Sequence, residues 1–131
     1  MKSDVWSAAD TELIEAARAV LNPRDVTEKL QAGQVASALR SRSGRIFTGV
    51  CIDAASSIGF CAEHAAVAAM LTSGEDRIDR VVAVNRDGEV KAPCGRCREL
   101  MRQMGGAQVL MPDGQVWDVM DLLPGQRPIS D

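Results

Sequence analysis

Four cysteines and one histidine constrain this chain more than any other feature of its sequence. Three of the cysteines lie in two short motifs, Cys61-Ala62-Glu63 and Pro93-Cys94-Gly95-Arg96-Cys97. Two thiolates with C-x-x-C spacing can bind one metal ion from a single helical turn, and a thiolate from another element supplies a third ligand. The fold must therefore bring two segments about thirty residues apart to one point.

Three protein ligands leave the fourth position of a tetrahedral zinc open for water, which is typical of catalytic rather than structural sites. Zinc lowers the pKa of such a water toward about 7 and so provides hydroxide at neutral pH. Glu63 follows Cys61 by two residues, so at a helix start we expect its carboxylate beside the metal without binding it. There it can accept the proton of the water and return it to the substrate, as general base and then general acid.

The residues around these motifs are expected to support the metal. Both motifs are predicted to open helices, where the positive end of the helix dipole favours thiolates. Three thiolates on Zn²⁺ leave a net charge of about −1, which Arg96 or Arg98 can offset through a hydrogen bond to sulfur. His64 points about 100° away from its neighbour Glu63 on a helix, so a supporting hydrogen bond or simple packing is favoured over metal binding.

Other interpretations of the same residues stay open. Cys51 can be the fourth ligand of a closed structural zinc site, in which Glu63 has no chemical role. The cysteines can also be free thiols of the core. Asp53 can cap a strand end instead of contacting substrate, and Arg96 and Arg98 can be solvated surface charges.

Composition excludes several classes of function. We expect residues 1–131 to form one domain with one core, since 131 residues are too few for separate cofactor and substrate domains. The net charge of −3 and the aromatic content of 3% argue against a polynucleotide partner, which requires a positive surface or stacking aromatics. No apolar run of about 18 residues occurs, so no membrane partner is expected.

The N-terminal residues 1–6 lack the apolar run of a signal peptide, and we expect a cytoplasmic protein. Reducing compartments disfavour disulfides, which again favours a metal-binding role for the cysteines.

Periodicity and turn residues predict alternating helices and strands. Helices are expected over residues 7–21, 61–73 and 93–105, and strands over 34–41, 45–53, 78–84, 109–111 and 116–119. The second helix is apolar nearly all round, so burial on most sides is expected. This order indicates an α/β layered domain with a mixed sheet.

Cys-Ala-Glu followed by Pro-Cys-Gly-x-Cys-Arg resembles the zinc-dependent cytidine deaminase family, and within it the blasticidin-S deaminases. Weaker similarity covers residues 35–39, 49–56 and 121–125, so the resemblance extends over most of the chain from Val35 onward.

This resemblance implies a cytidine deaminase-like three-layer α/β/α fold with a mixed five-stranded sheet. It implies one Zn²⁺ on Cys61, Cys94 and Cys97, and hydrolysis of a 4-amino pyrimidine to the 4-oxo form with release of ammonia. The implied substrate is a small-molecule cytosine nucleoside or analogue, as in pyrimidine salvage. The implied assembly is a homotetramer, or a homodimer, with sites near subunit interfaces.

The positions at which the family contacts the sugar differ in this chain. Cys51 and Asp53 stand where the family has Asn and Glu, and together with Ala62 they are the expected substrate contacts. His64 stands where the family has Arg. A thiol is a weaker hydrogen-bonding group than an amide, so we expect unmodified cytidine to be a poorer substrate than a free base, a sugar-modified nucleoside or a blasticidin-like analogue.

Two other functions share these motifs. A nucleic-acid cytosine or adenine deaminase uses the same zinc chemistry, and a non-catalytic zinc-stabilised module uses the ligands alone. Salt-sensitive affinity for a polynucleotide would indicate the first, and a dispensable Glu63 the second. The acidic net charge favours a small-molecule deaminase.

Overall fold

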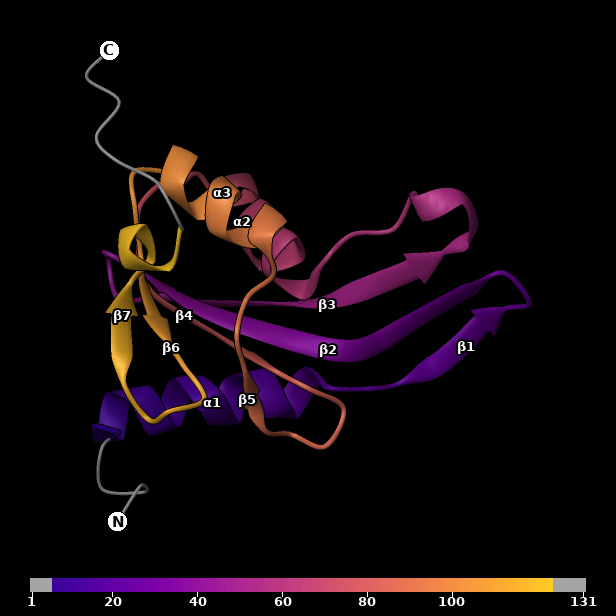
Figure 1. Ribbon diagram of the computed structural model, residues 1–131, viewed down its shortest axis with the longest axis horizontal. Helices are drawn as coiled ribbons and strands as arrows, with labels where there is room; N and C mark the ends of the chain where they lie inside the picture. The colour runs from indigo at the N-terminus through magenta and orange to yellow at the C-terminus, as the bar shows by residue number, and fades with distance from the viewer. Residues whose placement is uncertain (1–5, 124–131) are drawn as a thin grey trace.

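The computed structural model describes residues 6–123, which form a layered α/β fold (Figure 1). Its helices are α1 (Ala8–Val20), α2 (Ala62–Thr72) and α3 (Gly95–Gln103), with 3₁₀ turns η2 (Ala55–Ser57) and η3 (Val119–Leu122). Its strands are β1 (Arg24–Thr27), β2 (Leu30–Ser41), β3 (Ile46–Ala54), β4 (Ile78–Val84), β5 (Val90–Lys91), β6 (Gln108–Leu110) and β7 (Val116–Asp118).

Five strands lie side by side in the order β3-β2-β4-β6-β7, with β4 and β6 parallel and the other pairs antiparallel. The predicted mixed five-stranded sheet is therefore confirmed. Two further strands extend it, because β1 pairs with the beginning of β2 and β5 with the end of β4. The sequence did not predict β1, whose residues are all exposed and lack an apolar pattern.

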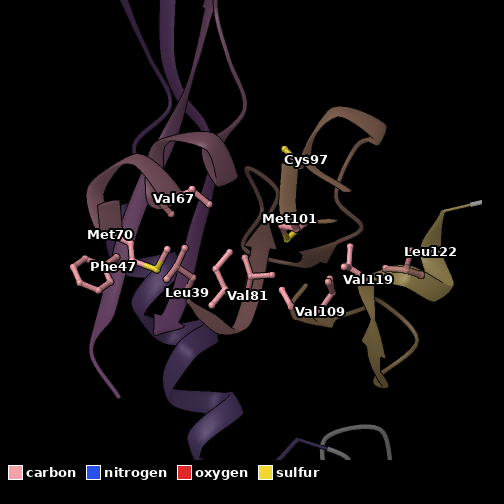
Figure 2. Close-up of a cluster of buried hydrophobic side chains, with 13 residues drawn as sticks. Leu39, Phe47, Val67, Met70, Val81, Cys97, Met101, Val109, Val119 and Leu122 are labelled. Carbon is pink, nitrogen blue, oxygen red and sulfur yellow. The ribbon is translucent and has the colours of Figure 1, made fainter. Parts of the chain in front are cut away.

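The sheet separates two helical layers. Helix α1 covers one face, and α2 and α3 lie on the other (Figure 1). Successive residues of β2 serve opposite faces, since Ala38 packs with the α1 layer and Leu39 with the α2–α3 layer. Val82 and Val81 divide in the same way on β4, and Figure 2 shows Leu39 and Val81 in the cluster beneath α2 and α3.

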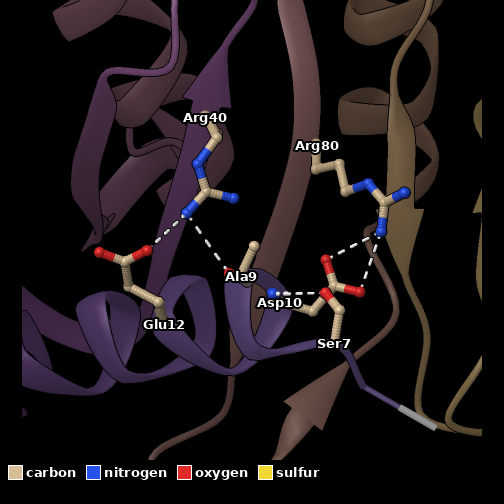
Figure 3. Close-up of polar contacts among 6 residues, drawn as sticks. All are labelled: Ser7, Ala9, Asp10, Glu12, Arg40 and Arg80. Carbon is tan, nitrogen blue, oxygen red and sulfur yellow. Dashed lines mark hydrogen bonds and ion pairs between the residues drawn. The ribbon is translucent and has the colours of Figure 1, made fainter.

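Polar contacts fix α1 at its N-terminal end (Figure 3). Ser7 is the N-cap, and its hydroxyl accepts a hydrogen bond from the backbone N–H of Asp10 at 3.0 Å. The buried Asp10 carboxylate receives a guanidinium N–H of Arg80 at 2.9 Å to each oxygen. Arg40 donates to Ala9 O and pairs with Glu12 at 3.0 Å. These contacts dock the first helix on β2 and β4.

Helix α2 is buried on one side only. Ala66, Val67 and Met70 face the sheet, whereas Ala68 is exposed and Leu71 is 47% exposed. The prediction of burial on most sides is wrong for the single chain, because no element within residues 6–123 covers the outer side of this helix.

No helix in the described part of the chain is long and apolar enough to cross a bilayer. The segment 121–125, which resembles the family's C-terminal motif, is only partly described: Asp121 and Leu122 belong to η3, and Pro124 and Gly125 lie outside residues 6–123.

Candidate functional site

The two cysteine motifs meet where α2 and α3 begin. Cys61 is the N-cap of α2 and Cys94 the N-cap of α3, each with extended backbone, and Cys97 lies in the first turn of α3. No side-chain oxygen or nitrogen caps either helix. The sulfurs lie at helix starts, where backbone N–H groups and the positive end of the dipole favour thiolates, and the Cys97 N–H hydrogen-bonds to the Cys94 sulfur.

The distances between the thiols suit one metal ion. Cys61 Sγ lies 3.3 Å from Cys94 Sγ, and no cysteine forms a disulfide within the described residues. The ligand atoms of Cys61, His64 and Cys97 all lie within 4.8 Å of one another. Two sulfurs bound to tetrahedral zinc at about 2.3 Å stand roughly 3.8 Å apart, so this donor set fits Zn²⁺ with small adjustments.

His64 lies closer to the ligands than its sequence position alone indicates. Its Nδ1 is 3.4 Å from Cys97 Sγ. Burial lowers the pKa of His64, and the positive charge of Arg96 adds to this against the opposing charge of Glu63. The ring nitrogen is thus within hydrogen-bonding distance of the Cys97 sulfur, and it is also near enough to complete a metal cluster.

The thiols differ in acidity. Burial raises the pKa of both Cys61 and Cys97. Burial acts upward on Cys94 as well, but hydrogen bonds from the Cys97 backbone N–H and the Cys61 thiol outweigh it and lower the pKa of Cys94. Cys94 is therefore the thiol that most readily becomes a thiolate in the metal-free chain.

Glu63 lies in the first turn of α2 and is only 4% exposed. Its charge acts to raise the pKa of Cys61, Cys94 and Cys97, so the carboxylate is near all three sulfurs. Its side chain has no hydrogen bond or ion pair within residues 6–123. A buried carboxylate without a protein partner is suited to binding a water molecule or a ligand.

A cavity of about 430 Å³ opens beside these groups, within the range of small-molecule sites. It is lined from β3, from the segment before α2, and from the first turns of α2 and α3. The expected substrate contacts Cys51, Asp53 and Ala62 all line it, together with Glu63 and Arg96. Cys61 and Cys94 also reach its wall.

Cys51 is engaged within the protein. It is 5% exposed, its sulfur accepts the backbone N–H of Val35 at 3.3 Å, and its thiol lies 3.6 Å from an Asp53 carboxylate oxygen. It does not belong to the cluster of Cys61, His64 and Cys97 found among the described residues, and its sulfur is engaged by Val35 and Asp53 instead.

Arg98 does not make the expected contact with sulfur. Its Nε donates to Pro93 O and its Nη1 to Leu122 O, both at 2.8 Å, so it ties the start of α3 to η3. Arg96 lines the cavity, and no hydrogen bond to a sulfur is formed by its guanidinium in the described part of the chain.

Sequence reasoning missed Phe60 and Lys91, which also line the cavity. Phe60 pairs with Ile52 through backbone hydrogen bonds of 2.9 and 3.0 Å. This pairing requires Gly59, because a Cβ there would lie 1.9 Å from Ile52 O. The only sequence signal for Phe60 as a lining residue is the glycine before it, next to the first motif. No sequence signal indicates that Lys91 lines the cavity.

Comparison with known proteins agrees with this geometry. Residues 9–112 match the family model described as the cytidine and deoxycytidylate deaminase zinc-binding region. The blasticidin-S deaminase of Bacillus cereus is 32% identical over 110 residues, covering 77% of this chain and 76% of that protein. The cytidine deaminase of Mycobacterium tuberculosis is 36% identical over 69 residues, so the chain spans about half of that relative, 52%.

Solved structures show the same arrangement over more of the chain. The cytidine deaminase of Mycobacterium leprae matches with a TM-score of 0.75 and 32% identity, covering 87% of this chain and 96% of that one. The Mycobacterium tuberculosis enzyme matches with a TM-score of 0.76 and 28% identity, covering 88% and 94%. The three-layer fold thus has counterparts of similar length among cytidine deaminases.

Proposed function

Because the chain belongs to the cytidine and deoxycytidylate deaminase family, we propose that it hydrolyses the 4-amino group of a cytosine nucleoside or analogue to the 4-oxo group, releasing ammonia. The observation that carries this proposal is Glu63, a buried carboxylate without a protein partner in the same cavity as Cys61 and Cys94. A zinc site that only stabilises a fold has no use for such a group.

The proposed ligands of Zn²⁺ are Cys61, Cys94 and Cys97. When bound, the zinc ion activates a water molecule for attack at neutral pH. His64 is proposed to donate from Nδ1 to Cys97 Sγ, which holds that thiolate in place and moderates its charge. The expected support from Arg96 and Arg98 is not part of this proposal, since neither guanidinium contacts a sulfur among the described residues.

Glu63 is the proposed proton carrier. Its carboxylate oxygen accepts a proton from the water whose oxygen attacks C4 of the pyrimidine, and returns it to the nitrogen that leaves as ammonia. Cys51, Asp53 and Ala62 are proposed to contact the substrate. Because the polar capacity of Cys51 is used by Val35 and Asp53, we propose that a plain ribose is held weakly and that unmodified cytidine is a poor substrate.

Replacing Glu63 tests the function. Glu63→Gln should keep the fold and the zinc but lose roughly 10²-fold or more in turnover, because an amide cannot carry the proton. Ammonia release from a panel of cytosine compounds measures this, with Glu15→Gln on the opposite layer as a matched control. Full activity of Glu63→Gln on every compound would rule out the proposed mechanism.

We propose a homotetramer, or at least a homodimer, as the active form, with a second subunit against the outer side of α2. Two large apolar side chains that are exposed in the single chain support this assembly. Leu71 on α2 is 47% exposed, and Phe60 at the cavity wall is 39% exposed. Light scattering should give a multiple of the 14.0 kDa chain mass, and Leu71→Glu should lower it. A mass of one chain would contradict the assembly.

We also propose that residues 1–131 act as one domain and that the protein works in cytoplasmic nucleoside metabolism. A site built from three thiols requires a compartment in which thiols stay reduced, which supports that location.

A further inference from the structure

The cavity beside Glu63 carries two cationic side chains that the proposed chemistry does not use. Lys91 comes from β5, three residues before Cys94, and Arg96 from the first turn of α3. Neither side chain makes a hydrogen bond or an ion pair within residues 6–123. By contrast, Arg80 pairs with the carboxylate of Asp10, and Arg98 donates to two backbone carbonyls.

The anionic groups of the cavity do not neutralise these cations. Glu63 is committed to proton transfer in the proposed reaction, and Asp53 contacts the Cys51 thiol. Neither carboxylate pairs with Lys91 or Arg96. The side chain that contacts the Cys97 sulfur is His64 rather than Arg96, so the donors of the Arg96 guanidinium remain available to a ligand.

We propose that Lys91 and Arg96 form a subsite for an anionic group on the sugar side of the substrate, a carboxylate or a phosphate. The inference rests on the proposed deaminase function and specifies its substrate class, a cytosine nucleoside whose sugar carries a negative charge. The cytosine ring has no anionic group, so the charge must belong to its substituent. A guanidinium binds carboxylate or phosphate through two parallel hydrogen bonds, and an ammonium adds a point charge.

This subsite compensates for the altered contacts on β3. Cys51 is 5% exposed and uses its thiol within the protein, so it adds little to the binding of a sugar hydroxyl. An ionic contact inside a cavity of about 430 Å³ can supply that affinity instead, and it would select against neutral nucleosides.

The test compares three substrates of the zinc-loaded protein: cytidine, cytidine 5′-monophosphate and the 5′-carboxylate of cytidine. At low ionic strength, kcat/KM for at least one anionic compound should exceed that for cytidine by about 10-fold or more. The better of the two anions identifies the group that the subsite takes. A ratio near one for both anions would overturn the proposal.

Variants assign the preference to the two residues. Lys91→Met and Arg96→Gln should each lower the ratio of anionic to neutral kcat/KM by about 10-fold, and Lys91→Arg should retain most of it. Lys29→Met removes the same charge outside the cavity and should leave the ratio unchanged. If these variants lowered kcat/KM equally for cytidine and for the anionic compounds, Lys91 and Arg96 would act on the metal centre, and the proposed subsite would be ruled out.

Binding measurements test the anionic subsite independently of the deaminase function on which it rests. If no compound releases ammonia, the proposed deamination fails, and calorimetric titration of the zinc-loaded protein still decides the subsite. About 10-fold tighter binding of the 5′-phosphate than of cytidine, lost in Lys91→Met and reduced by added salt, would support it. Equal affinities would refute it.

Discussion

At the scale of single residues, the contact between His64 and Cys97 is a main feature of the proposed metal site. The two atoms, Nδ1 and Sγ, lie 3.4 Å apart, and Cys97 is fully buried. Hydrogen-bonded partners of ligands orient them and tune the charge that they present to the metal. We therefore expect His64 to influence how Cys97 holds the metal.

His64→Ala should weaken zinc binding by about 10- to 100-fold, because Cys97 loses the group that orients it. His64→Gln, which retains a donor, should lose less. Competition with a chromophoric chelator measures the affinity, and Thr72→Ala on the exposed end of the same helix is the control. Unchanged affinity in His64→Ala would mean that the contact is packing only.

The spacing of the two motifs predicted which residues gather at the proposed metal site, but it did not predict the residues at the edge of the cavity. Cys61, Glu63 and Cys94 follow from local geometry, since each lies within one turn of a helix start. The rim depends on long-range contacts: Arg98 binds a carbonyl of Leu122, and Lys91 reaches the cavity from a two-residue strand. No periodic or turn signal in the sequence encodes such contacts.

Among the elements, β3 and α2 approach each other closely at Gly49. A Cβ at this position would lie 2.5 Å from both the Cβ of Ala65 and the backbone nitrogen of Ala66. The absence of a side chain therefore allows α2 to sit deep on the sheet, and α2 carries Glu63.

Gly49→Ala should destabilise the protein by about 1–3 kcal/mol, since the added methyl overpacks a closed interface, and should lower turnover by displacing Glu63. Urea unfolding measures the first effect and ammonia release the second. Gly95→Ala adds the same methyl where nothing lies within 4 Å, and its stability should not fall. Equal stability of the two variants would show that α2 has room to shift.

Element boundaries were predictable where capping and turn residues mark them. Ser7, a typical N-cap residue, caps the start of α1, and Ile78–Val84 is a strand over its full predicted length. The start of β2 was missed because Gly33, at φ 78°, lies in a register shift that breaks the alternation of side chains. The residues of β2 before this bulge also pair with β3, and the periodicity of side chains alone does not predict that the strand continues across a bulge.

At the scale of the whole molecule, the proposed metal ligands belong to one layer only. Cys97 lies in the cluster beneath α2 and α3 (Figure 2), and Cys61 packs against that cluster. The α1 cluster on the other face contains none of the proposed ligands. Zinc binding should therefore stabilise the two layers unequally.

Removal of zinc by a chelator should accelerate amide hydrogen exchange in α3 and the first turn of α2 by about 10-fold or more, with α1 and β4 remaining protected. Exchange read by mass spectrometry on peptides from each layer measures this. A uniform increase across both layers would show instead that the metal supports the fold as a single cooperative unit.

The alternation of side chains along β2 and β4 also has an evolutionary consequence. A substitution at Ala38 or Val82 disturbs contacts with α1, and one at Leu39 or Val81 disturbs contacts with α2 and α3. Compensating changes should therefore arise in different helices for adjacent positions of one strand. Related sequences should contain two sets of co-varying positions, interleaved residue by residue along the same strands yet independent of each other.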